Sequence, residues 1–360
     1  MERRKFIKAT IMGVAGVAAK SLAAESAAAE GTGQMGNVGK PSFGVNHEWG
    51  KLREVVIGIS PAEDFVLFYE DSQRWLIPPV DEFSRKYAGK RMIDIDADWA
   101  KRIERQVDAL AELVAREGVK VHRPERLRGD ERSFLAPNGE GAQLYTRDPM
   151  IVIGNHVIEA SLRLKCRQRE RYGLRPIIKK LVAERGAQWS SVPLGSPTCV
   201  DGPFLEGGDT LLNGYEIYVG VSGCASDMAG VDWLQAVLGA RYRVIPVALR
   251  SNVLHLDCAL GLVRPGLLVW CPEKLLDGLP MSLRDWDAIV VSKDEANLLA
   301  TNGLILEEGR MILDADNKRV IGELDKRGVD VIPHQFNGPI VCGGSLRCAH
   351  HPLLRESVLT

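Results

Sequence analysis

The chain has 360 residues, of which 45% are hydrophobic and 26% charged, and its formal net charge is -1. This balance is typical of a globular protein, and the length allows one large domain or two of ordinary size. Basic and acidic residues are interspersed, so the sequence gives no support for binding to nucleic acid or to a membrane surface.

Residues 1–30 have the pattern of an export signal. A basic start, ERRKFIKAT, precedes an apolar run of mostly small residues. The pair Arg3 and Arg4 resembles the twin-arginine signal, so we expect the twin-arginine machinery to export the protein to the periplasm or the medium. The apolar run contains Lys20 and is too short for a span of ~20 residues, so no stable membrane insertion is expected. The glycine-rich residues 31–44 then predict a flexible linker.

The folded part, predicted as one domain over residues 45–360, begins with a strand at LREVVIG. The segment DWAKRIERQVDALAELVAREG predicts the clearest helix, with Gly118 as its C-cap. Apolar residues repeat along it at helical spacing and line one face. They are Ile103, Val107, Leu110 and Val114. A strand at VKVHRP follows this helix.

The rest of the domain repeats one order of elements: two strands joined by a tight turn, a helix and a third strand. In TLLNGYEIYVG the turn falls at Asn213-Gly214, a pair that tolerates positive φ. Similar hairpins occur at MIVIGNHVIEAS, CALGLVRPGLLVWCP and NGLILEEGRMILDA. Five rough copies of a ββαβ-like unit predict a closed, pseudo-symmetric α/β array, in which distant residues meet at a central axis. The alternative is an ordinary mixed α/β sheet.

Four short stretches place a chemically active residue beside a predicted strand. They are YTRDP with Asp148, FLEGGD with Glu206 and Asp209, LHLD with His255 and Asp257, and GGSLRCAHHPL with Cys348. Several carboxylates, one histidine and one cysteine suit a planar cation whose carbon is open to attack. A guanidinium is such a cation, because its N–H groups match carboxylates and a thiolate can attack its central carbon.

The other cysteines and histidines give no sign of a metal site. No CxxC pair occurs, and no Cys/His cluster has the spacing of zinc ligands, so we expect no metal and no cofactor. The sequence leaves disulfide pairing open, although seven is an odd number of cysteines. Five of them lie in apolar or Gly/Ser surroundings and are interpreted as packing residues: Cys166, Cys199, Cys224, Cys258 and Cys271.

Taken together, these motifs resemble those of the arginine deiminase and amidinotransferase superfamily, the guanidino-group-modifying enzymes of the pentein fold. The matching segments are YTRDPMIVIGN, RQRERYG, FLEGGDTLL, HLDCALGLV and GGSLRC, and the resemblance runs from NHEWGKLREVVIG to CAHHPLLRE. It implies a five-bladed α/β propeller, which agrees with the repeated unit, and a single catalytic domain. It also implies a covalent adduct between the substrate and a cysteine.

Carried over to this chain, the resemblance makes Cys348 the nucleophile and His255 the acid and base. Asp148 and Asp257 would hold the guanidinium nitrogens. Glu206 would complete the catalytic group, either by orienting His255 or by contacting the substrate.

Asp209 and Arg347 are also predicted to bind substrate. For Arg347 two interpretations stay open: it binds a substrate carboxylate, or it pairs with a neighbouring acid. His350 and His351 are interpreted as structural rather than catalytic, since supporting metal ligands are missing nearby.

The motifs do not agree on the reaction. TRDP, EGGD and the arginine-rich segment resemble deiminases, whereas EVVIG and VIGNHVIEA resemble amidinotransferases. The loop after the EGGD hairpin, VSGCASD, lacks the arginine with which deiminases hold the carboxylate of free arginine. We expect a deiminase-type hydrolase of arginine or a related guanidino compound. The alternatives are an amidinotransferase with an amine acceptor and a non-catalytic protein that binds a guanidino ligand. The oligomeric state is left open.

Overall fold

The computed structural model describes residues 43–71, 73–135, 143–194, 202–340 and 342–356. The chain divides into two units, Met1–Lys40 and Pro41–Thr360, and the fold below is that of the second unit. The predicted export signal and the predicted linker up to residue 42 lie outside the described residues. Within the described ranges, no helix has the length and apolar character needed to cross a bilayer.

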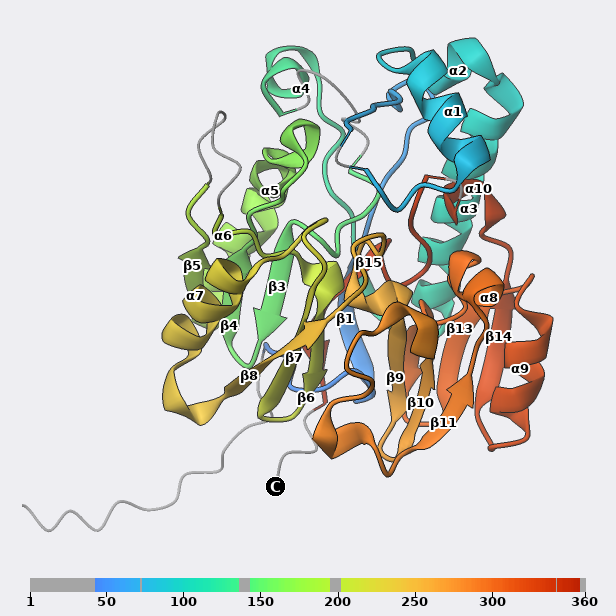
Figure 1. The fold of residues 1–360 in the computed structure, drawn as a ribbon. Helices are drawn as coiled ribbons and strands as arrows, with labels where there is room; N and C mark the ends of the chain where they lie inside the picture. The colour runs from blue at the N-terminus through green and yellow to red at the C-terminus, as the bar shows by residue number, and fades with distance from the viewer. Residues whose placement is uncertain (1–42, 72, 136–142, 195–201, 341, 357–360) are drawn as a thin grey trace, which may run out of the picture. The chain divides into compact units, whose positions relative to one another are not determined.

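Five three-stranded sheets make up the described fold (Figure 1). The first contains β15 (His350–Arg355), β1 (Leu52–Ile57) and β2 (Lys120–His122). The second contains β3 (Met150–Ile153), β4 (His156–Glu159) and β5 (Gln188–Ser191). The third contains β6 (Thr210–Asn213), β7 (Glu216–Val221) and β8 (Arg243–Ala248). The fourth contains β9 (Leu260–Arg264), β10 (Leu267–Trp270) and β11 (Asp287–Val290), and the fifth β12 (Leu304–Glu307), β13 (Arg310–Asp314) and β14 (Asp330–His334).

All five sheets share one topology, which confirms the predicted ββαβ-like repeat. The middle strand is antiparallel to one neighbour and parallel to the other. In four sheets the three strands follow one another along the chain. In the first sheet the antiparallel partner of β1 is β15, the last strand of the chain. The C-terminus therefore completes the unit that the N-terminal part of the domain begins.

Helices connect the parallel strands, as the sequence predicts for most units. The predicted long helix is α3 (Ala97–Arg116), whose buried face includes Ile103 and Leu110. The Asp96 side chain accepts a hydrogen bond from the Trp99 amide and caps its N-terminus, and Gly118 follows its end with a φ of 80°. The other connecting helices are α6 (Arg175–Arg185), α7 (Met228–Leu238) and α9 (Lys318–Asp325). The helical stretch expected between β10 and β11 consists of 3₁₀ turns, Pro272–Lys274 and Met281–Leu283.

Several short helices were not predicted from the sequence. They are α1 (Pro78–Tyr87), α2 (Met92–Ile95), α4 (Gly129–Leu135), α5 (Glu170–Gly173), α8 (Lys293–Asn297) and α10 (Asn337–Ile340). Two of them, α1 and α2, belong to a long connection between β1 and α3, drawn in blue to cyan in Figure 1. α2 has only four residues, too few to show a helical apolar face. In α1, Val80, Phe83 and Tyr87 recur at helical spacing, and Phe83 and Tyr87 pack against a hydrophobic cluster.

Buried hydrophobic side chains fill the space between the sheets and their helices. Three clusters account for them, and each draws on more than one unit of the repeat. Cys166, Cys224, Cys258 and Cys271 are buried, as expected for packing residues, whereas Cys199 lies outside the described part of the chain. Between the clusters lies a set of buried charged residues, which forms the candidate site.

Candidate active site

Each of the five units contributes a buried polar residue at the same place, shortly before the first strand of its sheet. These residues are Asp148 before β3, Glu206 before β6, Asp257 before β9, Asn302 before β12 and Cys348 before β15. All are at most 3% exposed. Because the units are related by pseudo-symmetry, equivalent positions converge near the centre of the array. The sequence did not single out Asn302, although the repeat alignment could have done so.

His255 is held between two carboxylates. Its Nε2 lies 3.0 Å from Oε2 of Glu206, and its Nδ1 lies 3.8 Å from Oδ1 of Asp148. The other Glu206 oxygen accepts the backbone N–H of Arg163 at 2.9 Å, so the carboxylate is fixed in place. His255 Nδ1 and Asp148 Oδ1 are buried and have no hydrogen-bond partner among the described residues. Glu206 therefore orients the ring, and Nδ1 faces the site.

The charges around His255 favour its protonated form. Burial alone would lower its pKa, but the charge of Asp148, the hydrogen bond that the ring donates to Glu206 and the charge of Asp209 outweigh burial and raise the pKa to about 10. At neutral pH the ring is an imidazolium, and its Nε2–H donates to Glu206. The proton on Nδ1 is then available to a group bound in the site.

Cys348 is positioned through its backbone. Its N–H donates to Oδ1 of Asn302 at 3.3 Å, and its carbonyl accepts the N–H of Arg147 at 3.1 Å. The thiol Sγ lies 3.8 Å from Oδ2 of Asp257. Asn302 also accepts the backbone N–H of Arg347, so one buried amide fixes two consecutive residues of the cysteine turn.

The surroundings of Cys348 keep its sulfur protonated in the absence of a bound cation. Burial raises the pKa of the thiol well above its usual value, and the negative charges of Asp257 and Asp148 raise it further. In this state the neighbouring groups favour the thiol, and a cation bound beside Asp148 and Asp257 would supply an opposing charge that favours the thiolate.

Asp148, His255 and Cys348 line one pocket, the catalytic pocket, together with Tyr145 and Arg167. Glu206 and Asp257 do not line it; they contact His255 and the Cys348 sulfur, respectively. Gln73, Trp75 and Leu76 come from the long connection between β1 and α3 and were not predicted to be near the site. Arg167, from the RQRERYG segment, donates to Oδ2 of Asp148 at 2.9 Å. It also forms two hydrogen bonds of 2.9 Å to Glu170, so its guanidinium is committed to holding Asp148.

Asp209 does not have the position expected of a substrate-binding residue. Its Oδ2 accepts the backbone N–H of Ser226 at 3.0 Å, and its Oδ1 accepts that of Leu256 at 2.9 Å. It is absent from the walls of the catalytic pocket. Burial raises its pKa to about 7. Because both oxygens bind backbone amides, Asp209 fixes the turn that carries His255 and Asp257.

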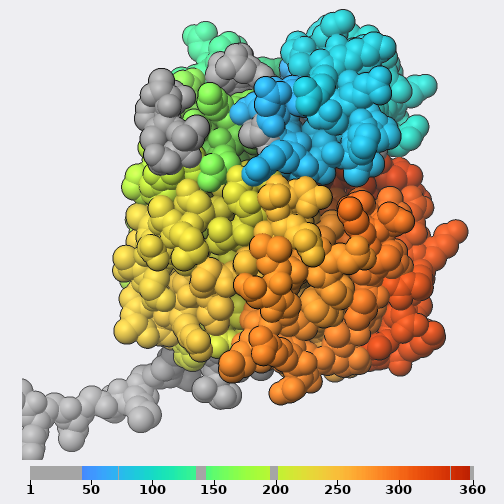
Figure 2. Space-filling model, in the orientation of Figure 1, coloured from blue at the N-terminus to red at the C-terminus, as the bar shows by residue number. Residues whose placement is uncertain are grey.

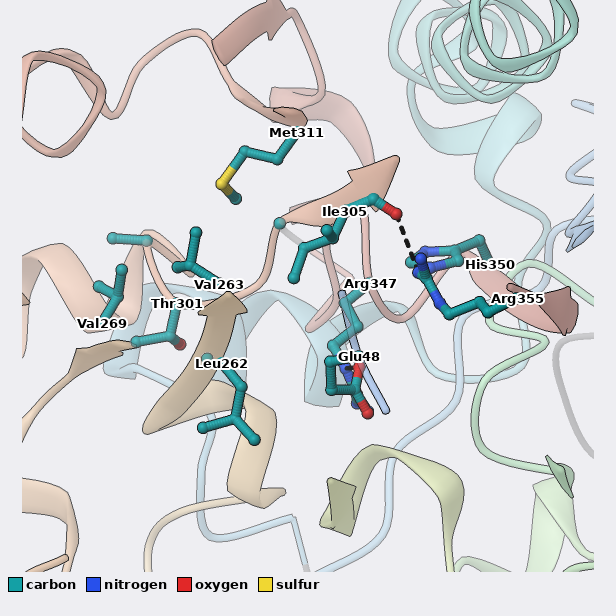
Figure 3. A pocket seen from close by; sticks show the side chains of 13 residues that line it. Glu48, Leu262, Val263, Val269, Thr301, Ile305, Met311, Arg347, His350 and Arg355 are labelled. Carbon is teal, nitrogen blue, oxygen red and sulfur yellow. Dashed lines mark hydrogen bonds and ion pairs between the residues drawn. The ribbon is translucent and has the colours of Figure 1, made fainter. Parts of the chain in front are cut away.

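For Arg347 the structure favours the second of the two interpretations, pairing with acids. Its guanidinium donates to Oδ2 of Asp257 at 2.9 Å and to Oε1 of Glu48 at 3.0 Å. It lines a separate cavity, shown in Figure 3, together with Glu48, His350 and Arg355. Neither Cys348 nor His255 lines that cavity. Arg347 thus supports Asp257 from behind, and its charge is not directed into the catalytic pocket.

The neighbouring histidines are buried, and their surroundings disfavour the charged form. His350 Nδ1 lies 2.7 Å from the carbonyl oxygen of Leu346, and its Nε2 lies 3.1 Å from Nη2 of Arg147. Since Arg147 can only donate, His350 accepts through Nε2 and donates through Nδ1. Burial lowers the pKa values of His350 and His351, and the charge of Arg147 lowers them further. These contacts agree with a structural role for His350.

One group of side chains in the described residues has the geometry of metal ligands. Asp148, Glu206 and His255 each offer an atom, and these atoms lie within 4.8 Å of one another. In this structure the imidazolium of His255 interacts with both carboxylates, so a metal would have to displace its proton. The donor set suits proton transfer as well as metal binding, and the expectation that no metal is required stays a prediction.

A propeller of five α/β units around a buried cysteine, histidine and carboxylates defines a class, the pentein-fold enzymes. The structure is similar to that of the amidinotransferase SxtG of Microseira wollei, with a TM-score of 0.75 and 24% identity over 88% of this chain and 98% of that chain. It is also similar to a dimethylarginine dimethylaminohydrolase, with a TM-score of 0.62 and 16% identity over 84% of this chain and 99% of that one.

The sequence comparisons point the same way. The L-arginine:L-lysine amidinotransferase of Pseudomonas savastanoi pv. phaseolicola is 26% identical over 347 residues, which cover 87% of this chain and 94% of that protein. No protein-family model matches the chain. The chain belongs to the arginine deiminase and amidinotransferase superfamily of guanidino-group-modifying enzymes, which confirms the predicted fold and family.

Gly208 of the EGGD segment gives a first test of the site. A Cβ at this position would lie 2.5 Å from Nδ1 of His255 and 2.8 Å from Oδ1 of Asp148. We predict that Gly208→Ala lowers kcat/KM about 100-fold, because a small displacement of a catalytic group has an effect of this order. Gly322→Ala is the matched control, since a Cβ there meets no atom within 4 Å. Equal activities of the two variants, both folded by circular dichroism, would contradict the assigned position of His255.

The pH dependence tests the interaction between Glu206 and His255. In the free enzyme kcat/KM should fall as the pH rises through the His255 pKa of about 10, since the imidazolium loses its proton there. Glu206→Gln removes a charge that raises this pKa. We therefore predict that the alkaline limb moves down by about one to two pH units. The measurement is kcat/KM between pH 7 and pH 11. If the alkaline limb of the profile stays at the same pH in the variant, Glu206 does not control the pKa of His255.

Proposed function

We propose that the protein is an amidinotransferase that moves an amidino group from a guanidino donor to an amine through a covalent adduct on Cys348. The observation that carries the proposal is the arrangement of Cys348, His255 and Asp148 around one pocket. The relatives with full-length similarity support transfer, because the protein from Pseudomonas savastanoi and SxtG are both amidinotransferases.

Binding of the donor would depend on the two aspartates. Asp148 presents Oδ1 to the pocket, where it can accept N–H groups of a guanidinium in a charge-assisted hydrogen bond. Asp257 lies next to the Cys348 sulfur and brings a second negative charge. The bound cation offsets both charges, which lowers the pKa of Cys348, and the thiol gives its proton to water.

In the first half of the reaction the Cys348 thiolate attacks the guanidinium carbon. A C–S bond forms, and the bond from that carbon to the leaving nitrogen breaks with its electron pair on nitrogen. His255 gives its Nδ1 proton to this nitrogen, so a neutral amine departs and His255 becomes neutral. A cationic amidino thioether stays on Cys348, held by the charges of Asp148 and Asp257.

The second half reverses these roles with another amine. The acceptor nitrogen attacks the same carbon while neutral His255 takes a proton from it. The C–S bond breaks with its electron pair on sulfur, which restores the thiolate and the imidazolium. Glu206 acts in both halves by keeping Nδ1 directed at the reacting carbon.

The hydrolase expected from the sequence remains the second candidate function. The deiminase-like TRDP and EGGD motifs and the fold shared with a dimethylarginine dimethylaminohydrolase favour it. In a deiminase ammonia leaves in the first half, and the rest of the donor stays on Cys348 as an alkylthiouronium. Water then attacks the same carbon and gives up a proton to His255, the C–S bond breaks with its electron pair on sulfur, and a ureido product leaves. The two functions use the same residues, so only the products distinguish them.

The central test is a Cys348→Ser variant with a panel of guanidino donors. We predict that this variant folds and loses turnover by a factor of ~10³ or more, because a hydroxyl is a poor nucleophile at neutral pH. The wild-type protein, quenched during turnover, should carry an added amidino group on the peptide containing Cys348. Mass spectrometry of products with and without added amines separates transfer from hydrolysis. Substantial turnover by folded Cys348→Ser would refute the covalent mechanism.

We also propose that the enzyme acts outside the cytoplasm, on the basis of the N-terminal sequence alone. Lysine lacks the planar guanidinium of arginine, so we predict that replacement of both Arg3 and Arg4 by Lys retains the protein in the cytoplasm. Cell fractionation with immunoblotting measures this. Normal export of the double variant would contradict the twin-arginine signal.

A further inference from the structure

A second, larger pocket adjoins the catalytic pocket. The two share Trp75, Leu76, Leu254 and Gly343 as lining residues, so they lie side by side. The larger pocket, which we call the annex, encloses about 810 Å³ with its open mouth included, against about 410 Å³ for the catalytic pocket. It lies where the long connection containing α1 meets residues 252–299, the boundary of blue and orange surfaces in Figure 2.

The annex is lined mainly by apolar side chains. Two of them are unusually exposed for their size: Ile77 at 46% and Leu298 at 50%. The other apolar residues that line the annex alone are Val80, Val253, Ala296, Leu299 and Ile340. Leu299 adopts a φ of 56°, a left-handed conformation that leucine disfavours. An open apolar surface next to a reactive centre is the usual character of a small-molecule site.

Charge in and around the annex argues against a zwitterionic ligand. Among the described residues that line it, Lys274 is the one charged side chain, and its ammonium donates to the carbonyls of Cys258 and Ala296. In the catalytic pocket Arg167 is the one arginine or lysine among the described lining residues, and Asp148 and Glu170 hold it. A free amino acid would therefore have to bury its ammonium and carboxylate there without matched partners, which is unfavourable.

We propose that the annex binds the apolar body of the amine that accepts the amidino group, an alkyl or arylalkyl amine, and the same body in its guanidino product. This inference rests on the function proposed above. The reacting nitrogen lies beside Cys348 and His255, and the chain or ring passes Trp75 and Leu254 into the annex. Apolar contact then selects this substrate over polar amino acids of similar length.

The test measures binding and turnover separately. In the Cys348→Ser protein, isothermal titration with methyl-, butyl- and hexylguanidine should show affinity rising about threefold to fourfold for each methylene that enters the annex. Hexylguanidine should also bind more tightly than L-arginine. In the wild-type protein, supplied with the guanidino donor that forms the Cys348 adduct in the panel above, hexylamine should accept the amidino group, and mass spectrometry should detect hexylguanidine.

A matched pair of variants, made in both proteins, connects these results to the annex. Leu298→Asn places a polar side chain in its wall, whereas Leu276→Asn changes an equally exposed leucine, at 56%, that does not line it. Leu298→Asn should weaken hexylguanidine binding at least tenfold and leave methylguanidine binding unchanged. Leu276→Asn should affect neither.

Each of the following results would overturn either the annex proposal or the proposed function. Tighter binding of L-arginine than of hexylguanidine, or equal hexylguanidine affinity in the two variants, overturns the annex proposal. If Leu298→Asn changes only the sedimentation of the protein, the surface is a subunit interface and the proposal is also overturned. If binding depends on chain length but the wild-type protein forms no Cys348 adduct, the proposed function is refuted and the annex proposal is retained. If the adduct forms but binding does not depend on chain length, the annex proposal is refuted and the proposed function is retained.

Discussion

The pairing of β15 with β1 determines the position of Cys348, the proposed nucleophile. β15 runs antiparallel to β1, with His350 opposite Ile57 and His351 opposite Val56. Cys348 stands two residues before this strand, so the register of the pairing determines where its sulfur lies. A slip of one residue would exchange the two faces of β15 and turn the cysteine away from Asp257. The catalytic pocket therefore depends on closure of the first unit by the C-terminus.

Closure also buries several charges, and the structure neutralises most of them in pairs. Asp148 pairs with Arg167, Asp257 with Arg347, and Glu206 with His255. Unpaired charges in such a place would be costly, which explains why the site contains so many supporting residues. Two atoms of these paired residues, Asp148 Oδ1 and His255 Nδ1, have no hydrogen bond among the described residues, and both residues line the catalytic pocket. These two atoms are therefore positioned to contact a bound substrate.

The units have equivalent positions but different chemistry. The buried polar residue that stands two to four positions before the first strand of each sheet is an acid in three units, an amide in one and a thiol in one: Asp148, Glu206, Asp257, Asn302 and Cys348. Outside this ring, the connection between β1 and α3 forms part of the pocket wall. The repeated units thus supply the polar residues of the candidate site, and the connection between β1 and α3 adds apolar residues to the wall of its pocket.

The sequence alone determined the repeat and the family and supplied the residues proposed to carry the chemistry, because turn pairs, strand alternation and short motifs are local signals. Asn213-Gly214 marked a hairpin, and FLEGGD and GGSLRC marked the site. Only the tertiary structure decided what each polar side chain contacts. Asp209 and Arg347 look like substrate ligands in the sequence, yet one binds backbone amides and the other pairs with Glu48 and Asp257. Such partners lie far away along the chain, 299 residues in the case of Arg347 and Glu48, so no local pattern records them.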